Sequence, residues 1–554
     1  MFKKLLNKES VFLIAILAVF VLLIIPATGQ IYHQDEYSWL TQMDGTDHSP
    51  QVHPPLYLFL GRITGEVIGF GHIRWVTVPF ALTNVLLVYA VSFRLTRRRS
   101  IALIAAGLFA LNAYSILAAT MVDIDGALLP FFVLLAYLAY LHILDKQHRW
   151  YWVLAVALVG GFLSKLSFIL FCGALIVDWS LRILERRKES IRHTLRLALP
   201  WLAGGVVLIG IVYLLATRIL PGVVEYAAHF RSLDLSSRAY ADLAYKLLKS
   251  TVFLGPLIML GALTALFYRD YRQRYRFWWL YLTASLLFYM VIFDFTTLTI
   301  ERYFMFVIAP LALIAAEPLV ALIKTIRSTP RYRIILLQAF VVTAFVGALL
   351  FIPHNVLPLY PKDAFAHRAL SLRWDFLVPI TGGSGPIGFY VSALYTGLTW
   401  IMMTSSALFW IRIKSARRTF AAALFLSLGV LMTAVMFQEF LFGGIYGSPN
   451  RVAWETVNYV NANPDIHQVI TYYNIAPYDL RLSGKYNSRF FVTLKRDYVG
   501  RINAWRGHYM IVEFPAIAID DRYMQVITKC PIIKEFQDKT IRSYIYDCTK
   551  IPLP

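Results

Sequence analysis

An acidic pair, Asp35-Glu36, follows the first strongly apolar stretch of the chain, and a His-Pro-Pro segment begins soon afterwards at His53. Carboxylates at the end of a membrane span are costly to keep beside lipid, so their presence indicates a functional site. A carboxylate can take the proton from an attacking hydroxyl group, which is the role of a general base. We therefore treat Asp35 and Glu36 as the first candidate active site.

Further polar residues lie at the ends of apolar stretches that are far apart in the sequence. They include Asp123, Asp125, Lys165 and Arg302. Carboxylates and cations gathered in one layer predict a cavity that binds an anion and moves a proton. The alternative interpretation is structural: the carboxylates are solvated loop charges, Lys165 marks a tight turn, and Arg302 is an interfacial anchor.

The composition indicates that a membrane surrounds these residues. Of 554 residues, 58% are hydrophobic and 15% are charged, which is too apolar for a soluble protein of this size. The formal net charge is +21, but the basic residues lie between apolar stretches, which argues against a nucleic-acid partner. We expect a polytopic α-helical membrane protein.

Apolar stretches of roughly 17–25 residues are long enough to cross the hydrocarbon core, and they predict thirteen spans. The spans begin near Val11, Arg74, Ile101, Gly126, Trp150, Leu166, Leu197, Thr251, Phe277, Tyr303, Ile334, Ile387 and Thr419. Twelve is the alternative, because only Ser164-Lys165 separates the fifth stretch from the sixth. The first stretch resembles a signal peptide, but its length predicts a retained span.

Lys and Arg residues gather in every second connection, for example in the run from Arg94 to Arg99. Such residues mark the cytoplasmic side, which predicts a multi-pass protein of the plasma (inner) membrane with a cytoplasmic N-terminus. Asp35 and Glu36 then face the exoplasm. Residues 28–72 and 218–250 mix aromatic and charged side chains and are expected to form juxtamembrane helices on that side.

The chain is expected to divide into a transmembrane part, residues 1–443, and a small exoplasmic α/β domain, residues 444–554. A helix is predicted over residues 451–461, and strands over residues 469–473 and 509–514. Cys530 and Cys548 both lie in this tail, and a disulfide between them would suit an oxidising compartment. The alternative is two free thiols.

Together these residues resemble the GT-C glycosyltransferases, in particular the branch of protein O-mannosyltransferases and aminoarabinose (lipid A) transferases. The resemblance covers roughly residues 10–325. It rests on the acidic pair, His53-Pro54-Pro55-Leu56-Tyr57, the turn from Arg94 to Arg99, the Asp125 turn, Gly161-Phe162-Leu163-Ser164-Lys165 and Arg302-Tyr303. It implies a GT-C fold and transfer of a sugar from a polyprenyl-phosphate donor to an acceptor on the exoplasmic face. The donor sugar is open, and so is the acceptor, whether protein, lipid or glycan.

The resemblance also suggests roles. Lys165 and Arg302, with Tyr303 beside it, would hold the donor phosphate, and His53 would contribute more weakly. Asp123 and Asp125 are two positions apart and would point differently on a helix, so only one is expected to face the cavity, and Asp125 is the one that matches the family pattern. With Asp35 as base and Glu36 as its support, a single direct displacement would invert the configuration of the anomeric carbon.

Two alternatives remain open at this point. A divalent metal site built from His33, Asp35, Asp47 and His48 is conceivable, but the spacing fits no standard ligand pattern, so no metal or other cofactor is expected. A transporter or flippase of a lipid-linked anion would also place charges in a membrane. It should show related halves and charges at the midplane, and the sequence indicates neither.

Overall fold

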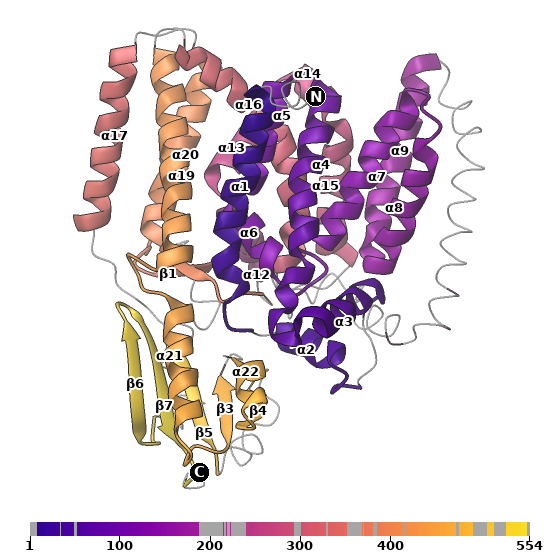
Figure 1. Cartoon of the computed structure of the whole chain (residues 1–554). Coiled ribbons are helices and arrows are strands. Elements are labelled where there is room, and N and C mark those ends of the chain that lie inside the picture. The colour runs from indigo at the N-terminus through magenta and orange to yellow at the C-terminus, as the bar shows by residue number, and fades with distance from the viewer. Residues whose placement is uncertain are drawn as a thin grey trace.

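The computed structural model shows a helical bundle with a β-sheet below one of its ends (Figure 1). The residues that the structure describes are 8–33, 35–48, 53–187, 240–292, 301–327, 331–351, 371–380, 385–413, 417–472, 476–490, 507–514 and 528–550, with 214, 218, 222 and 368. The predicted span near Leu197 lies outside these residues, as does most of segment 218–250.

The helices of the bundle are apolar over most of their length. They are α1 (Lys8–Thr28), α4 (Val78–Thr96), α5 (Arg99–Ala110), α6 (Ala113–Thr120), α7 (Leu128–Leu144), α8 (Trp150–Ser164), α9 (Ile169–Arg187), α12 (Tyr240–Leu254), α13 (Pro256–Ala265), α15 (Arg276–Leu287), α16 (Ile308–Arg327), α17 (Arg331–Phe351), α19 (Ala393–Arg412) and α20 (Arg417–Phe442). Among the described residues, six helical stretches are long and apolar enough to cross a membrane, or up to eight if each bent pair is one span. The chain is therefore a multi-span membrane protein, and the predicted count of thirteen is not confirmed.

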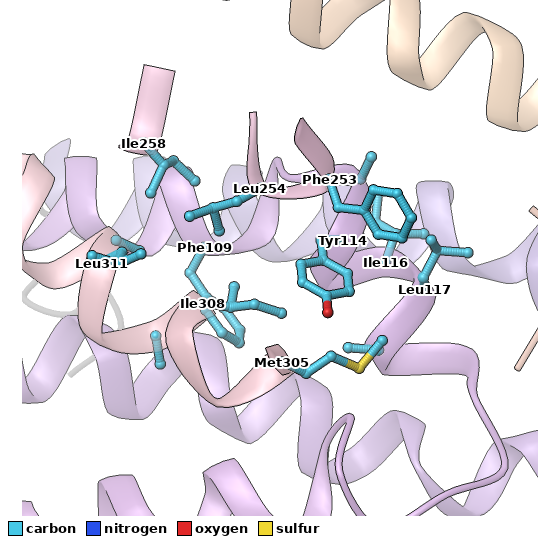
Figure 2. Close-up of a cluster of buried hydrophobic side chains, with 14 of the residues drawn as sticks. Phe109, Tyr114, Ile116, Leu117, Phe253, Leu254, Ile258, Met305, Ile308 and Leu311 are labelled. Atoms are coloured by element: carbon cyan, nitrogen blue, oxygen red, sulfur yellow. The ribbon is translucent and has the colours of Figure 1, made fainter. Parts of the chain in front are cut away.

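Two of these spans are bent, and the bends meet in the middle of the bundle. Helices α5 and α6 meet at 64°, because Asn112 leaves the helical conformation and its side chain caps α6. The break between α12 and α13 is 102° and follows from Gly255, at φ 81°, and the proline after it. Figure 2 shows side chains of both bent pairs packed with the start of α16, and Tyr114 meets Phe253 edge to face.

Short helices cover the end of the bundle that carries the acidic pair (Figure 1). They are α2 (Asp35–Met43), α3 (Leu56–Ile68) and the 3₁₀ segment η2 (Phe70–Val76). Trp39 of α2 and Tyr57 of α3 are buried and pack edge to face. At the opposite end lies the short helix α14 (Arg269–Arg274).

The predicted span near Ile387 begins later than expected. Residues Phe389–Ser392 form strand β2, which pairs antiparallel with β1 (Leu377–Ile380). Helix α19 starts only at Ala393, where the Ser392 side chain accepts a hydrogen bond from the Tyr395 backbone N–H. An apolar stretch alone does not distinguish a buried strand from the first turn of a helix.

The C-terminal residues form a five-stranded sheet of order β4-β3-β5-β7-β6. Its elements are α21 (Pro449–Ala462), β3 (Val469–Tyr472), α22 (Pro477–Leu482), β4 (Tyr486–Phe490), β5 (Tyr509–Phe514), β6 (Ile532–Asp538) and β7 (Ile541–Asp547). The strand β3 is parallel to β4 and β5, and the other pairs are antiparallel. The helix and the two strands predicted here are thus present, and a disulfide joins Cys530 to Cys548.

Candidate active site

Glu36 forms an ion pair with Arg74, and both side chains are wholly buried. Its Oε2 lies 2.6 Å from Arg74 Nη2, and its Oε1 lies 3.0 Å from Arg74 Nε. The carboxylate also accepts the backbone N–H groups of His33 and Val122. These four hydrogen bonds fix the loop before α2 against the turn after α6.

Arg74 fixes the same loop from the other side. Its guanidinium donates to the backbone carbonyls of Ala27, Gln30 and Ile31 at the end of α1. A guanidinium carries five donors in a rigid fork, which suits this task better than an ammonium group would. From the sequence, Arg74 was expected only to begin a membrane span. The signal that could have identified Arg74 is its charge, because it is a basic residue just before an apolar stretch.

The second pair of carboxylates lies in a tight turn between α6 and α7. Asp123 and Asp125 are both buried, and the Asp125 backbone N–H donates to the Asp123 side chain. Gly126 is required here, because a Cβ at this position would lie 2.2 Å from the carbonyl oxygen of Ala118. The close packing of this turn on α6 therefore presents both carboxylates at the same end of the bundle.

Each of these carboxylates binds one of the two predicted cations. Lys165, which follows α8, places its Nζ 2.5 Å from Asp125. Arg302, in the 3₁₀ segment η5 (Glu301–Val307), places its Nη1 2.6 Å from Asp123. Only Asp125 was expected to face the cavity, whereas the turn directs both carboxylates to cations.

Tyr303 lies between the two cations. Lys165 Nζ is 4.6 Å from the centre of its ring, and Arg302 Cζ is 5.0 Å from it. The Arg302 guanidinium also donates to the Tyr303 hydroxyl, over 3.3 Å. The ring thus holds the ammonium and guanidinium groups side by side, through cation–π contacts that gain strength where water is excluded.

The two aspartates have different electrostatic surroundings. Burial alone would raise the pKa of Asp123, but Arg302, His53 and Lys165 bring it below its ordinary value. For Asp125, burial raises the pKa more than Lys165 lowers it, and Asp123 adds to the rise. Asp123 is therefore the more firmly ionised of the two, and it is the one that holds the guanidinium.

His53 lies at the edge of this charged layer. Its ring stacks on Trp39, with ring centres 5.4 Å apart. Its half-buried position, with Lys165 and Arg302 nearby, lowers its pKa to about 3, although Asp123 opposes that change. His53 is thus neutral at physiological pH, and it contributes a polar ring nitrogen rather than a positive charge.

Helix α2 connects the acidic pair to the other charges. Asp35 is its first residue, and Trp39 stands one turn later. The Trp39 indole N–H donates to Asp123 over 3.2 Å. The side chain of Asp35 lies outside the described residues, so its proposed role rests on the position of its helix.

An apolar pocket opens behind the charged layer. It is lined by Phe109, Leu129, Val133, Tyr281, Met305 and Pro310, among others. Gly126, next to Asp125, and Met305, three residues after Arg302, both belong to its wall. Apolar surface therefore adjoins two of the ion-paired segments. Within the described part of the chain, no three His, Cys, Asp or Glu residues are close enough to hold a metal ion.

Comparisons with known proteins bear on the fold of the chain. Residues 52–217 match the family model of dolichyl-phosphate-mannose-protein mannosyltransferases. No match was found among the curated proteins. Among solved structures, apo ArnT from Cupriavidus metallidurans is similar over 99% of this chain and 100% of its own, at 14% identity and a TM-score of 0.53.

The chain therefore has the GT-C glycosyltransferase fold, which confirms the fold that the residues resemble. Two further solved structures are similar at TM-scores below 0.5. The apo oligosaccharyltransferase from Archaeoglobus fulgidus matches over 92% of this chain and 70% of its own, at 13% identity and a TM-score of 0.47. The S. cerevisiae protein O-mannosyltransferase complex Pmt1-Pmt2, bound to the sugar donor, matches over 39% of this chain and 34% of that one, at 17% identity and a TM-score of 0.31.

Proposed function

We propose that this protein is a membrane glycosyltransferase that moves a sugar from a polyprenyl-phosphate donor to an acceptor hydroxyl group on the exoplasmic face. The observation that carries the proposal is the pair of buried cations, Lys165 and Arg302, which both lie against the Tyr303 ring. The family match over residues 52–217 supports a lipid-phosphate sugar as donor.

The two cations would act on the phosphate group. As the bond between the anomeric carbon and the phosphate oxygen breaks, negative charge builds on the departing lipid phosphate. An ammonium and a guanidinium that are already oriented stabilise that charge without reorganising. Asp123 and Asp125 keep both cations charged and aimed, and Arg302 has enough donors to hold a carboxylate and a phosphate oxygen together.

Asp35 would act on the acceptor. Its carboxylate takes the hydroxyl proton while the acceptor oxygen attacks the anomeric carbon, and the lipid phosphate leaves from the opposite face. A single displacement of this kind inverts the anomeric configuration. Glu36, tied to Arg74, keeps the loop that bears Asp35 in place. The chemistry needs no metal ion in this scheme.

A transporter of lipid-linked anions is the second candidate. It is disfavoured by the family match and by the position of the ion pairs at one end of the bundle, whereas transport sites lie near the membrane midplane.

The test is sugar transfer in proteoliposomes that contain polyprenyl-phosphate sugars. Wild type should release polyprenyl phosphate and yield a product of inverted configuration, whereas Asp35→Asn should lose about 10²-fold or more of the rate. Asp47→Asn, in the connection that follows α2, is the matched control and should stay close to wild type. Full transfer by a folded Asp35→Asn variant, or a product with retained configuration, would reject the proposed base.

A further inference from the structure

Residues 31–37, which comprise the loop before α2 and the first turn of that helix, contact the C-terminal sheet and its helices. This segment, here called the acidic loop, carries both Asp35 and Glu36. Helix α22 contacts α2, and Figure 1 shows α22 beside the lower end of the bundle. The sequence separation between the two parts exceeds 400 residues, so the contact is made by the fold and not by the local chain.

The first contact is at the start of the acidic loop. The backbone N–H of Ile31 donates to the side-chain oxygen of Asn450, in the first turn of α21, over 3.1 Å. The Ile31 side chain is buried in one apolar cluster with Ala476 and Leu480, which flank and belong to α22. A backbone group and a side chain of the loop are thus both held by the C-terminal part.

The second contact is at Tyr32. Its ring packs edge to face on Tyr478 of α22, with ring centres 5.7 Å apart. On the ring face, Arg74 Cζ lies 4.5 Å from the centre, and the Tyr32 hydroxyl donates to the Gly71 carbonyl. Tyr32 therefore connects α22 to Arg74, the residue that binds Glu36.

The third contact is at the other end of the acidic loop. The ring of Tyr37 packs on Tyr486 at the start of β4, with ring centres 5.4 Å apart. The guanidinium of Arg481 lies 6.0 Å from the centre of the same Tyr37 ring. Contacts at positions 31, 32 and 37 thus flank Asp35 and Glu36 on both sides.

We propose that the C-terminal part positions the catalytic loop: α21, α22 and β4 hold residues 31–37 so that the acidic pair stays aligned with the ion-paired cations. Tyr478 is then a positioning residue that acts through Tyr32 and Arg74, although it touches no reacting group. A loop fixed at both ends cannot shift its carboxylates without breaking a contact, and a displacement of about 1 Å can cost roughly 10²-fold in rate.

This inference rests on the proposed function for its activity readout, and the test therefore has a second readout. Tyr478→Leu removes the edge contact and keeps an apolar side chain, whereas Tyr478→Phe keeps the ring. The matched control is Tyr459→Leu, because Tyr459 packs edge to face on Phe536 within the C-terminal part and away from the loop. All four proteins are measured as full-length chains in proteoliposomes.

Tyr478→Leu should lower the rate at saturating donor about tenfold, with the KM for the lipid donor changed less than about twofold. The backbone amides of residues 31–37 should also exchange with solvent about tenfold faster. Tyr478→Phe and Tyr459→Leu should leave both quantities near wild type. Unchanged exchange and rate in a folded Tyr478→Leu variant would overturn the inference. If wild type transfers no sugar, the proposed function fails, and the exchange measurement alone decides whether α22 holds the loop.

Discussion

Buried acid–base pairs occur at both ends of the bundle, but they are built differently. At the site end, both partners are withheld from water: exposure is 0% for each of Glu36 and Arg74, and 1% and 6% for Asp123 and Arg302. Toward the opposite end, Asp178 is wholly buried, but its partners Arg182 and Arg276 are 28% and 20% exposed. There the guanidinium groups can reach water while their stems cover apolar surface.

The difference teaches what each set of charges does. Asp178 binds Arg182 one helical turn away, accepts the Tyr140 hydroxyl and receives Arg276 from the start of α15. These contacts join neighbouring helices α7, α9 and α15. Fully buried pairs are expensive to desolvate and add little stability over apolar packing, so the concentration of such pairs at the site end is better explained by catalysis.

The largest difference between the two ends of the bundle is expected for Glu36→Gln. It removes one charge and leaves Arg74 buried without its counter-ion, which should lower the free energy of unfolding by about 3–5 kcal/mol. Glu317→Gln is the counterpart at the other end. Its partner Arg274 is 35% exposed, so the guanidinium can turn to water and the loss should be about 1 kcal/mol or less. Chemical denaturation in detergent measures both, and equal losses would remove the distinction between the ends.

Lys165→Gln tests the chemistry at the site end. Removing the ammonium group should reduce sugar transfer by roughly 10²-fold, because one oriented charge on the departing phosphate is lost. Lys165→Arg should restore part of the rate, since it restores the charge. Arg182→Gln, at the other end, should keep the rate within about threefold of wild type. A rate for Lys165→Gln as high as that of Arg182→Gln would show that the ammonium serves packing only.

A smaller effect is expected at the boundary between the two parts of the molecule. Burial raises the pKa of Asp479 to about 6, and Glu36 adds to the rise. Arg74 and the Tyr32 backbone amide act in the opposite direction, because both favour the charged carboxylate. Because the pKa is higher in the folded state, protonated Asp479 stabilises the fold at acid pH, and this stabilisation is lost as pH rises through about 6.

Asp479→Asn should therefore be more stable than wild type at pH 8 and unfold at a higher temperature. The free energy of unfolding should differ by on the order of 1 kcal/mol, after allowance for the partial exposure of the side chain. The two proteins should converge near pH 4. Thermal unfolding at several pH values measures the difference, and Asp547→Asn is the control for a carboxylate on β7. A difference in unfolding temperature between Asp479→Asn and wild type that grows as the pH falls would contradict the raised pKa of Asp479.

Much of the fold could be predicted because apolar stretches and turn residues act locally. The helix at residues 451–461 and the strand at 509–514 follow from side-chain periodicity alone. The delay of α19 could not be predicted, since the pairing of β2 with β1 depends on residues outside the apolar stretch itself. The predicted count of thirteen spans is not confirmed, because only the described residues can be counted and because bends at Asn112 and Gly255 break two of the predicted stretches.

At the site, the residue types at the ends of spans indicated Lys165, Arg302 and Asp125, because charges near lipid are rare. Which carboxylate forms an ion pair with which cation could not be predicted from the sequence in the same way. Asp123 was set aside on the assumption that residues two apart point differently, which holds for a helix but not for the turn before Gly126. Arg74 was missed because its partner, Glu36, is 38 positions away and no spacing rule connects them.

The most direct test compares two arginines that each bind one buried aspartate. Arg302→Gln and Arg276→Gln remove the same group, one at each end of the bundle, and sugar transfer from a polyprenyl-phosphate donor is measured in proteoliposomes at equal amounts of folded protein. Arg302→Gln should transfer about 10²–10³-fold more slowly than wild type, and Arg276→Gln should stay within about threefold. Equal rates for the two variants would contradict the assignment of catalysis to the site end.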